Sequence, residues 1–289
     1  MSREAQQTTV ARPVTKKGIG LHSGAKCAVA LLPAEPDAGI VFICESGVAL
    51  PATVDHVVGT DRSTTLGLGE ARVRSVEHLL AALYGLAVDN VSIQVQGPEV
   101  PACDGSAQEW VEVLGQAGRK RLGARRKTGT LAKAVWVTNG DAWAVASPAR
   151  NLAVGVGVEY PGTAAARQTF WVSLARGQFA SQVAPARTFC LRREYEALLA
   201  AGLGKGGRLE NTFVVDADGY SGPLRFPDEV VRHKTLDVIG DIALGGWRLA
   251  AHIVTVRPSH RMNVELARAV RGALSPGGGT RLEGGGRSE

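Results

Sequence analysis

A chain of 289 residues is long enough for two domains of ordinary size, and we expect two. Apolar residues make up 45% of the chain and charged residues 21%, a balance typical of soluble globular proteins that excludes a disordered or fibrous one. The formal net charge of +6 suits a small anionic partner better than nucleic acid, because the basic residues are mostly scattered and no nucleic-acid-binding motif accompanies them.

The cysteines and the apolar runs indicate the compartment. The four cysteines are widely separated and form no C-x-x-C pair, so neither a disulfide framework nor a thiolate zinc site is indicated. The first residues contain no apolar signal region, and no later run reaches about 18 uncharged apolar residues. We therefore expect a cytoplasmic protein with no integral membrane segment, and a monomer.

The first half of the chain predicts one α+β unit. Ser75 is a plausible N-cap for its first helix, which places Glu77 and His78 in the first turn of that helix. Apolar and polar residues alternate in the predicted strands and recur at helical spacing in the predicted helices. The predicted strands are 27–33, 39–43 and 91–97, and the predicted helices are 75–85 and 107–118.

A basic run separates the two halves. Residues 118–129 contain glycine and many cations but no apolar periodicity, which is typical of an exposed inter-domain linker rather than of a nucleic-acid-binding arm. The boundary is expected near Lys127, which gives a first domain of residues 1–126.

The second half predicts another α+β unit, in residues 127–275. Its expected strands are 134–138, 143–147, 152–160, 169–174 and 249–256, and its expected helices are 193–202, 228–244 and 263–274. The last residues, 276–289, are rich in glycine and contain one leucine, so we expect a disordered tail.

The long helix of the second half carries potential metal ligands. His233, Asp237 and Asp241 recur every four residues on the face opposite its valines. Zinc needs lone pairs that converge at about 2 Å, and an i, i+4 pair on a helix supplies two of them. His78 is the candidate for a third ligand, because it follows Glu77 in a first helical turn. For the H-x-x-x-D pair taken alone, the solvated face of an amphipathic helix is the favoured alternative.

The other histidines carry weaker signals. His260 lies between a predicted strand and the final helix, where a rigid support can expose a functional imidazole. His22 stands among glycines that indicate a tight turn, but no βαβ order surrounds them, so a dinucleotide-binding loop is excluded. His56 and His252 look like ordinary surface or core residues.

Six motifs together resemble the UDP-3-O-acyl-N-acetylglucosamine deacetylase family, the zinc enzymes of lipid A synthesis. Each motif alone is weak, but six in the same order and spacing are specific. The resemblance extends over about residues 15–274 and implies two similar α+β domains, packed as layered sheets and helices, with the zinc site in the cleft between them. The motifs are GIGLHSG (18–24), SVEHLLAAL (75–83), DNVSIQVQGPEVPACDGSA (89–107), ARTF (186–189), VRHKTLDVIGD (231–241) and SHRMN (259–263).

The resemblance implies a role for the metal-site residues. His78, His233 and Asp237 match the family's Zn²⁺ ligands, which leave a fourth position for water, as a hydrolytic site requires. Glu77 matches the general base that takes a proton from this water.

The resemblance also implies roles around the reacting amide. His260 matches the histidine that protonates the leaving amine, and Asp241 matches the carboxylate that orients it. Thr188 matches a donor to the oxyanion, and Lys234 matches a lysine near the reacting centre. Phe189 is expected to pack against the sugar.

Other residues are expected to contact the rest of the substrate. His22 belongs to a matched motif, and Leu191 and Leu203 are expected along the family's apolar passage for a fatty acyl chain. Arg257 is a candidate phosphate contact, with a strand-end surface arginine as the equal alternative. Three cations stand where the family tends to be apolar or neutral: Arg192, Lys205 and Arg208.

These matches favour hydrolysis of the N-acetyl amide of UDP-3-O-(3-hydroxyacyl)-N-acetylglucosamine, which gives acetate and the free amine. The expected partner is therefore a UDP-sugar that carries an acyl chain. The cations in the passage keep a second hypothesis open, a zinc-dependent deacetylase of another N-acetylated sugar or sugar nucleotide. A non-catalytic zinc-binding homologue is a third hypothesis, although a structural metal needs neither Glu77 nor His260.

Overall fold

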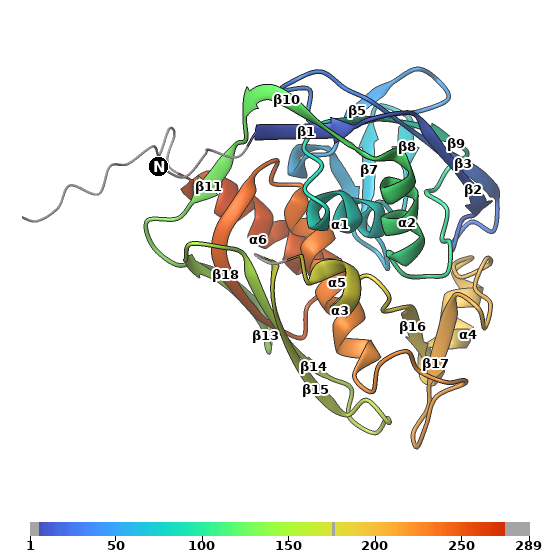
Figure 1. The fold of residues 1–289 in the computed structure, drawn as a ribbon. Helices are drawn as coiled ribbons and strands as arrows, with labels where there is room; N and C mark the ends of the chain where they lie inside the picture. Colours follow the sequence, from blue (N-terminus) through green and yellow to red (C-terminus); the bar gives the residue numbers. More distant parts are fainter. Residues whose placement is uncertain (1–5, 175–176, 275–289) are drawn as a thin grey trace, which may run out of the picture.

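The computed structural model describes residues 6–174 and 177–274, and Figure 1 shows its ribbon. Helices and strands are mixed along the chain, which confirms the α+β class. The tail at 276–289 that we expect to be disordered lies outside the described residues. The division into domains at 1–126 and 127–275 stays a prediction.

A five-stranded sheet forms much of the first half. Its strands in spatial order are β2 (Val14–Ile19), β3 (Lys26–Leu32), β9 (Val91–Gln96), β4 (Ile40–Ile43) and β5 (Ala49–Pro51). β9 pairs antiparallel with β3 and parallel with β4. The predicted alternation is confirmed, because Val91, Ile93 and Val95 are buried and the residues between them are less so.

Two helices accompany this sheet near their predicted positions: α1 (Glu77–Gly85) and α2 (Gln108–Ala117). In α2, Trp110, Val113 and Leu114 are buried at helical spacing, as expected. A short 3-10 helix η1 (Val54–His56) and a small sheet of β6 (Val57–Gly59), β7 (Thr65–Leu68) and β8 (Ala71–Val73) complete the unit.

The basic run that we expect to be an exposed inter-domain linker contains regular strands. It forms β10 (Arg119–Arg125), which pairs antiparallel with β1 (Gln6–Val10), and then β11 (Thr128–Thr130). Its cations are mostly exposed. Backbone pairing requires no apolar periodicity, so a buried strand such as β1 can recruit a basic segment that has none.

A six-stranded sheet forms the second half. Its path is β12 (Val135–Asn139), β13 (Ala142–Pro148), β18 (Arg248–Val256), β14 (Ala153–Glu159) and β15 (Arg167–Ser173), and β11 pairs with the first residues of β18. Helices α5 (Glu229–Ala243) and α6 (His260–Ala273) pack against one face of it. The strands and helices predicted for this half are confirmed, with shifts at their ends.

A small parallel βαβ unit projects from the second half, at the right of Figure 1. It consists of β16 (Thr188–Leu191), α4 (Arg192–Ala200) and β17 (Thr212–Val215), and the short helix α3 (Phe179–Gln182) precedes it. Among the described residues, no helix is both long and apolar enough to cross a membrane.

Helices α1, α5 and α6 lie between the two larger sheets, as Figure 1 shows. α1 and α5 pack directly against each other. A glycine makes this close approach possible, because a Cβ at Gly240 would lie 2.1 Å from the backbone oxygen of Glu77. The first turn of α1 and the middle of α5 are thereby brought together, and these two segments carry the predicted metal ligands.

Candidate metal centre and active site

The start of α1 differs from its predicted form. Ser75 is not the N-cap: it has a φ of 57°, and its hydroxyl donates to the carboxylate of Glu99 at 2.7 Å. Val76 occupies the N-cap position, and the helix begins at Glu77. The buried Glu99 competes for the serine hydroxyl, so a tertiary contact replaces the local cap. Glu77 and His78 still fall in the first turn, as predicted.

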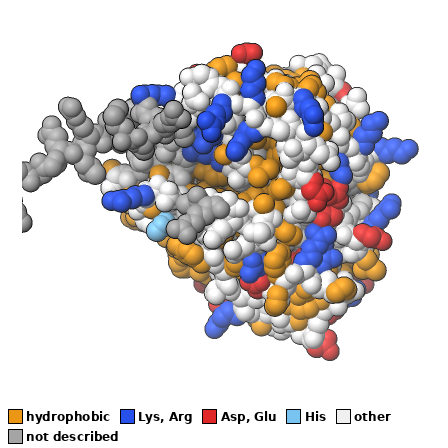
Figure 2. Space-filling view, viewed as in Figure 1, with side chains coloured by type: hydrophobic (Ala, Val, Ile, Leu, Met, Phe, Trp, Pro, Cys, Tyr) orange, Lys and Arg blue, Asp and Glu red, His pale blue; other side chains and the backbone are white. Residues whose placement is uncertain are grey.

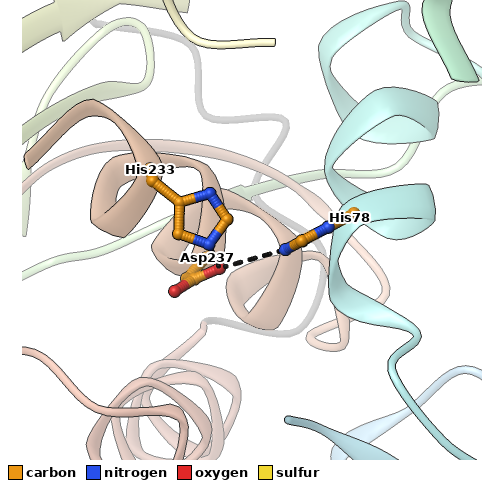
Figure 3. Close-up of side chains that lie close together, drawn as sticks. All are labelled: His78, His233 and Asp237. Atoms are coloured by element: carbon orange, nitrogen blue, oxygen red, sulfur yellow. Dashed lines mark ion pairs between the residues drawn. The ribbon is translucent and has the colours of Figure 1, made fainter. Parts of the chain in front are cut away.

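Three potential metal ligands meet between α1 and α5, as Figure 3 shows. Nε2 of His78 lies 3.6 Å from Oδ1 of Asp237, and Nε2 of His233 lies 3.4 Å from the same oxygen. The three ligand atoms all lie within 4.8 Å of one another. Nδ1 of His233 is 3.1 Å from the backbone oxygen of Ala186, which only accepts, so Nδ1 donates and the Nε2 lone pair is left for the site.

The charge state of these groups fits a divalent cation. Oδ1 of Asp237 is buried without a hydrogen-bond partner, whereas Oδ2 accepts from Nζ of Lys234 at 2.7 Å. Burial alone raises the pKa of Asp237, but the charge of Lys234 holds it well below its ordinary value. Burial lowers the pKa of His233 to about 4, so its imidazole is neutral. A neutral imidazole and an unpaired carboxylate oxygen are groups that coordinate metals.

The alternative interpretation of the helix motif, a solvated polar face, is wrong. His233 is 3% exposed and Asp237 is 2% exposed, and Asp241 is fully buried. α1 covers the polar face of α5, and the six-stranded sheet covers its apolar face. Both faces of the helix are therefore buried.

Glu77 is a buried carboxylate beside the ligands. Its Oε2 accepts a hydrogen bond from the backbone N–H of Thr64 at 2.9 Å. Burial raises its pKa, and the nearby His260 and His78 oppose that rise. A carboxyl group with a raised pKa can both take and return a proton near neutral pH.

His260 is held by a second buried carboxylate. Its Nδ1 lies 2.9 Å from Oδ2 of Asp241, which also accepts from the side-chain amide of Asn263 at 2.9 Å. The other oxygen of Asp241 accepts from the hydroxyl of Thr64 at 2.6 Å. Burial lowers the pKa of His260, but the charges of Asp241 and Asp237 outweigh burial and raise it to about 9.

His260 lies in the final helix and not between strand and helix as predicted. α6 begins at His260, three residues before the predicted start, because the hydroxyl of Ser259 caps it by accepting from the backbone N–H of Met262. The imidazole therefore has a helical support.

A cavity of about 360 Å³ contains these groups. Glu77, the three potential ligands and His260 line it together with four other predicted site residues: Thr188, Phe189, Leu191 and Lys234. A second cavity of about 390 Å³ shares Thr188 and Phe189 with the first and extends along the βαβ unit, where Tyr195, Leu198 and Leu199 line it.

Two of these residues have defined neighbours. The backbone N–H of Thr188 donates to the backbone oxygen of Gly105 at 2.8 Å. The ring of Phe189 stacks near Phe213 with centroids 5.9 Å apart, and it presents an edge to His233 at 6.1 Å. Phe189 thus forms a wall where the two cavities meet.

The remaining predicted residues lie farther from the metal ligands. His22 lines the second cavity and not the first. Among the described residues, neither Leu203 nor Arg257 lines either cavity. The guanidinium of Arg257 pairs with Glu159 at 2.6 Å and with Asp141 at 3.1 Å, as expected of a strand-end surface arginine.

Sequence reasoning missed several residues of the site. Thr64 bonds both Glu77 and Asp241, Asn263 holds Asp241, and Tyr160 and Arg62 line the first cavity. Asn263 belongs to a matched motif and could have been found there. Thr64 lies just before a short strand where no periodic pattern singles it out.

Comparison with known proteins agrees with this geometry. The profile of the family described as UDP-3-O-acyl N-acetylglycosamine deacetylase matches residues 7–271. Three relatives named UDP-3-O-acyl-N-acetylglucosamine deacetylase are similar over most of their length. The protein of Anaeromyxobacter dehalogenans is 43% identical, covering 91% of this chain and 87% of the relative. That of Thermosynechococcus vestitus is 42% identical (91% and 93% covered), and that of a Nostoc strain is 40% identical (92% and 98% covered). The chain therefore belongs to the UDP-3-O-acyl-N-acetylglucosamine deacetylase family.

Proposed function

We propose that this chain hydrolyses the N-acetyl amide of UDP-3-O-(3-hydroxyacyl)-N-acetylglucosamine with the help of zinc, as a step of lipid A biosynthesis. The relatives carry the name of this activity. The observation that carries the proposal is the convergence of His78, His233 and Asp237 on one point of a cavity that also contains Glu77 and His260. The cytoplasmic location and the monomeric state stay predictions from the sequence.

Zinc fits the ligands that the chain offers. His78, His233 and Asp237 would hold it, and the unpaired Oδ1 of Asp237 supports this assignment, since a buried anionic oxygen without a partner is costly unless a cation meets it. When bound, zinc supplies a Lewis acid that polarises the acetyl carbonyl and lowers the pKa of a water molecule toward about 7.

Glu77 is proposed as the base that takes a proton from the attacking water. Thr64 holds one of its oxygens through a backbone N–H, which leaves the other free to face the reaction. Its position next to His78 in the chain keeps the carboxylate beside the ligands. The proton then resides on Glu77 while the C–O bond forms at the acetyl carbon.

His260 is proposed as the acid that protonates the leaving amine. Asp241 occupies Nδ1, so Nε2 is the nitrogen that can deliver a proton into the cavity. With a pKa of about 9, the imidazole holds its proton at neutral pH. When the C–N bond breaks, this proton passes to the nitrogen, and the products are acetate and a free amine.

Two further groups are proposed to stabilise the developing negative charge. Thr188 and Lys234 both line the cavity. The ammonium group of Lys234 also neutralises part of the charge of Asp237, so its effect on the reaction includes the orientation of that ligand.

The second cavity is proposed to hold the acyl chain. Leu198, Leu199 and Val214 give it apolar walls beside the sugar-facing Phe189. Of the cations that depart from the family pattern, Arg192 lines this cavity but pairs with Asp216 at 2.8 Å, so its charge is compensated. Arg208 remains on the wall.

Acetate release tests this proposal with four substrates: UDP-N-acetylglucosamine without an acyl chain and its 3-O-acyl forms with short, medium and long chains. Zinc-loaded protein is expected to prefer an acylated form by at least about tenfold in kcat/KM, because each buried methylene group adds to binding. Equal rates with and without an acyl chain would indicate that the natural substrate is another acetamido sugar nucleotide. No release from any of them would refute the deacetylase assignment.

A further inference from the structure

Within residues 6–174 and 177–274, no helix packs against one face of the six-stranded sheet. α5 and α6 cover the face that contains Ala144, Ile253 and Val154, all of which are buried. On a strand, successive side chains point to opposite faces, so the residues between these point away from the helices. This outer face carries three of the five tryptophans of the chain, namely Trp136, Trp143 and Trp171.

Two of these tryptophans stand at opposite ends of one cross-strand row. The strand register aligns Trp136 with Val145, Val145 with Val254, Val254 with Gly155, and Gly155 with Trp171. Adjacent strands lie about 4.8 Å apart, so this row spans about 19 Å. We call the row together with Trp143, which stands in the next row opposite Val256, the tryptophan face.

The tryptophans are exposed although they stand on regular strands. Trp136 is 69% exposed, Trp171 is 51% exposed and Trp143 is 39% exposed. The indole ring of Trp171 lies over Gly155, so close that a Cβ on the glycine would be 2.5 Å from it. The same indole ring makes a T-shaped contact with the ring of His252. Figure 2 shows apolar side chains at the surface on the side where Figure 1 places β13 and β18. Exposed apolar patches of this kind mark interaction sites.

The charges around the tryptophan face are positive or neutral. Lys133 precedes β12 and Arg150 follows β13, so both lie at the same end of the sheet, and neither has a carboxylate partner among the described residues. At the opposite end two carboxylates meet two cations, since Arg257 pairs with Glu159 and Asp141 and Arg167 pairs with Glu159 at 3.3 Å.

Aromatic side chains with unpaired cations beside them favour one kind of partner. Indole rings prefer the boundary between water and lipid, and lysine and arginine near that boundary are attracted to anionic headgroups. We propose that the tryptophan face binds the surface of a membrane that contains anionic lipids, as a peripheral contact.

Two other occupants fit less well. Residues 275–289 contain Leu282 as their one large apolar side chain, which is too little to cover three indole rings. A second copy of the chain, docked face to face, would bring Lys133 and Arg150 of both copies to one interface, and like charges repel there.

The contact would also orient the candidate active site. β14 and β18 both cross the tryptophan face, and the residues that follow them, Tyr160 and Pro258 to His260, line the first cavity. A membrane on this face would therefore lie beside the sheet end that leads to the site. An enzyme whose substrate or product is amphiphilic gains from such proximity. This advantage rests on the proposed function, whereas the binding itself does not.

Vesicle co-sedimentation of the full chain tests the proposal. The probes are vesicles of phosphatidylcholine alone and vesicles in which part of it is replaced by phosphatidylglycerol. We expect binding to the anionic vesicles, weaker binding to neutral ones, and a shift of tryptophan emission to shorter wavelength on binding. Trp136→Ser is expected to weaken binding by about tenfold, the loss expected when one large apolar side chain no longer leaves water.

Matched variants separate this result from a folding defect. Leu68→Ser removes another exposed apolar side chain, 53% exposed and on a different sheet, and should leave binding unchanged. Lys133→Ser should lower binding to anionic vesicles and leave binding to neutral ones as it was. Absence of binding to both vesicles, or equal losses for Trp136→Ser and Leu68→Ser, would overturn the proposal. So would a dimer in sedimentation equilibrium without lipid that Trp136→Ser dissociates.

Discussion

The proton of His260 depends on the carboxylates around it. Burial opposes a charged imidazole, and Asp241 outweighs burial because it meets Nδ1 directly at 2.9 Å. Thr64 and Asn263 fix the position of Asp241 on both of its oxygens. The ability of His260 to act as an acid is thus a property of a network and not of one residue.

Asp241→Asn tests this network at the scale of a residue. The raised pKa of about 9 means that wild-type kcat/KM falls as pH rises through about 9, where His260 loses its proton. Without the negative charge of Asp241, the pH at which kcat/KM falls is expected to move down toward about 6.5, the ordinary pKa of histidine. The ion pair between His260 and Asp241 also stabilises the fold. Its contribution to the free energy of unfolding is fully present below about pH 6.5 and is lost as pH rises through about 9.

The readouts are kcat/KM and thermal unfolding measured over pH 5 to about 10. Asp228→Asn at the N-cap of the same helix, which removes a partly buried pair with Arg232 away from His260, is the control and should leave the pH at which each profile changes in place. An alkaline limb that stays near pH 9 in Asp241→Asn would contradict this account of His260.

A site residue could be predicted from the sequence where local spacing alone fixes its position. The i, i+4 spacing put His233 and Asp237 on one face of a helix without further information. The convergence of His78 on them could not follow from spacing, because it depends on the packing of α1 against α5. The positions of Leu203 and Arg257, which line neither of the two cavities, also depend on tertiary neighbours that spacing does not give.

At the scale of elements, the contact of α1 with α5 decides the geometry of the site. Gly240 lies against the backbone oxygen of Glu77, so the distance between the helices depends on the absence of a side chain there. Alanine is the better helix former by about 1 kcal/mol, yet here its Cβ would meet backbone atoms that cannot move alone.

Gly240→Ala is therefore expected to destabilise the protein by about 2 kcal/mol and to lower kcat, since the helices must separate and shift Glu77 and His78 relative to Asp237. Urea unfolding and acetate release are the measurements. Gly115→Ala is the matched control, because it lies in α2 with open space around it and should be neutral or stabilising. Equal stability and activity of the two variants would show that the close contact is not required.

Most elements could be predicted because their hydrophobic periods are regular. The basic strand β10 could not, since its pairing with β1 depends on backbone groups that every residue carries. The N-cap of α1 was predicted wrongly for a different reason, because the hydroxyl of Ser75 donates to the buried carboxylate of Glu99.

For the whole molecule, the candidate metal centre links the two halves of the chain. His78 comes from the first half, and His233 and Asp237 come from the second. The partly buried Arg248 makes a second link, as it pairs with Asp89 and donates to the backbone oxygen of Leu83 near the end of α1. The layered arrangement rests on such long-range contacts, which is why it could be expected only from the resemblance and not from periodicity.

Removing the metal is expected to loosen this link. A cation that binds the folded chain alone, at about 1,000 times its Kd, adds about 4 kcal/mol of stability, so a chelator should lower Tm by several degrees. Differential scanning calorimetry with and without EDTA measures this change. Asp237→Ala should unfold at the same temperature in both conditions. A wild-type Tm that is indifferent to EDTA and to added zinc would argue against a metal between the halves.

The proposed mechanism requires a zinc ion and Glu77 to act together in one site. Its most direct test is acetate release by Glu77→Gln and wild-type protein, each with its zinc content measured on the same sample. We expect one zinc per chain in both proteins and a kcat at least about 100-fold lower in the variant, because the amide keeps the shape of the carboxylate but cannot take a proton. Unchanged zinc-dependent release by Glu77→Gln, or the absence of bound zinc in an active wild type, would contradict the account.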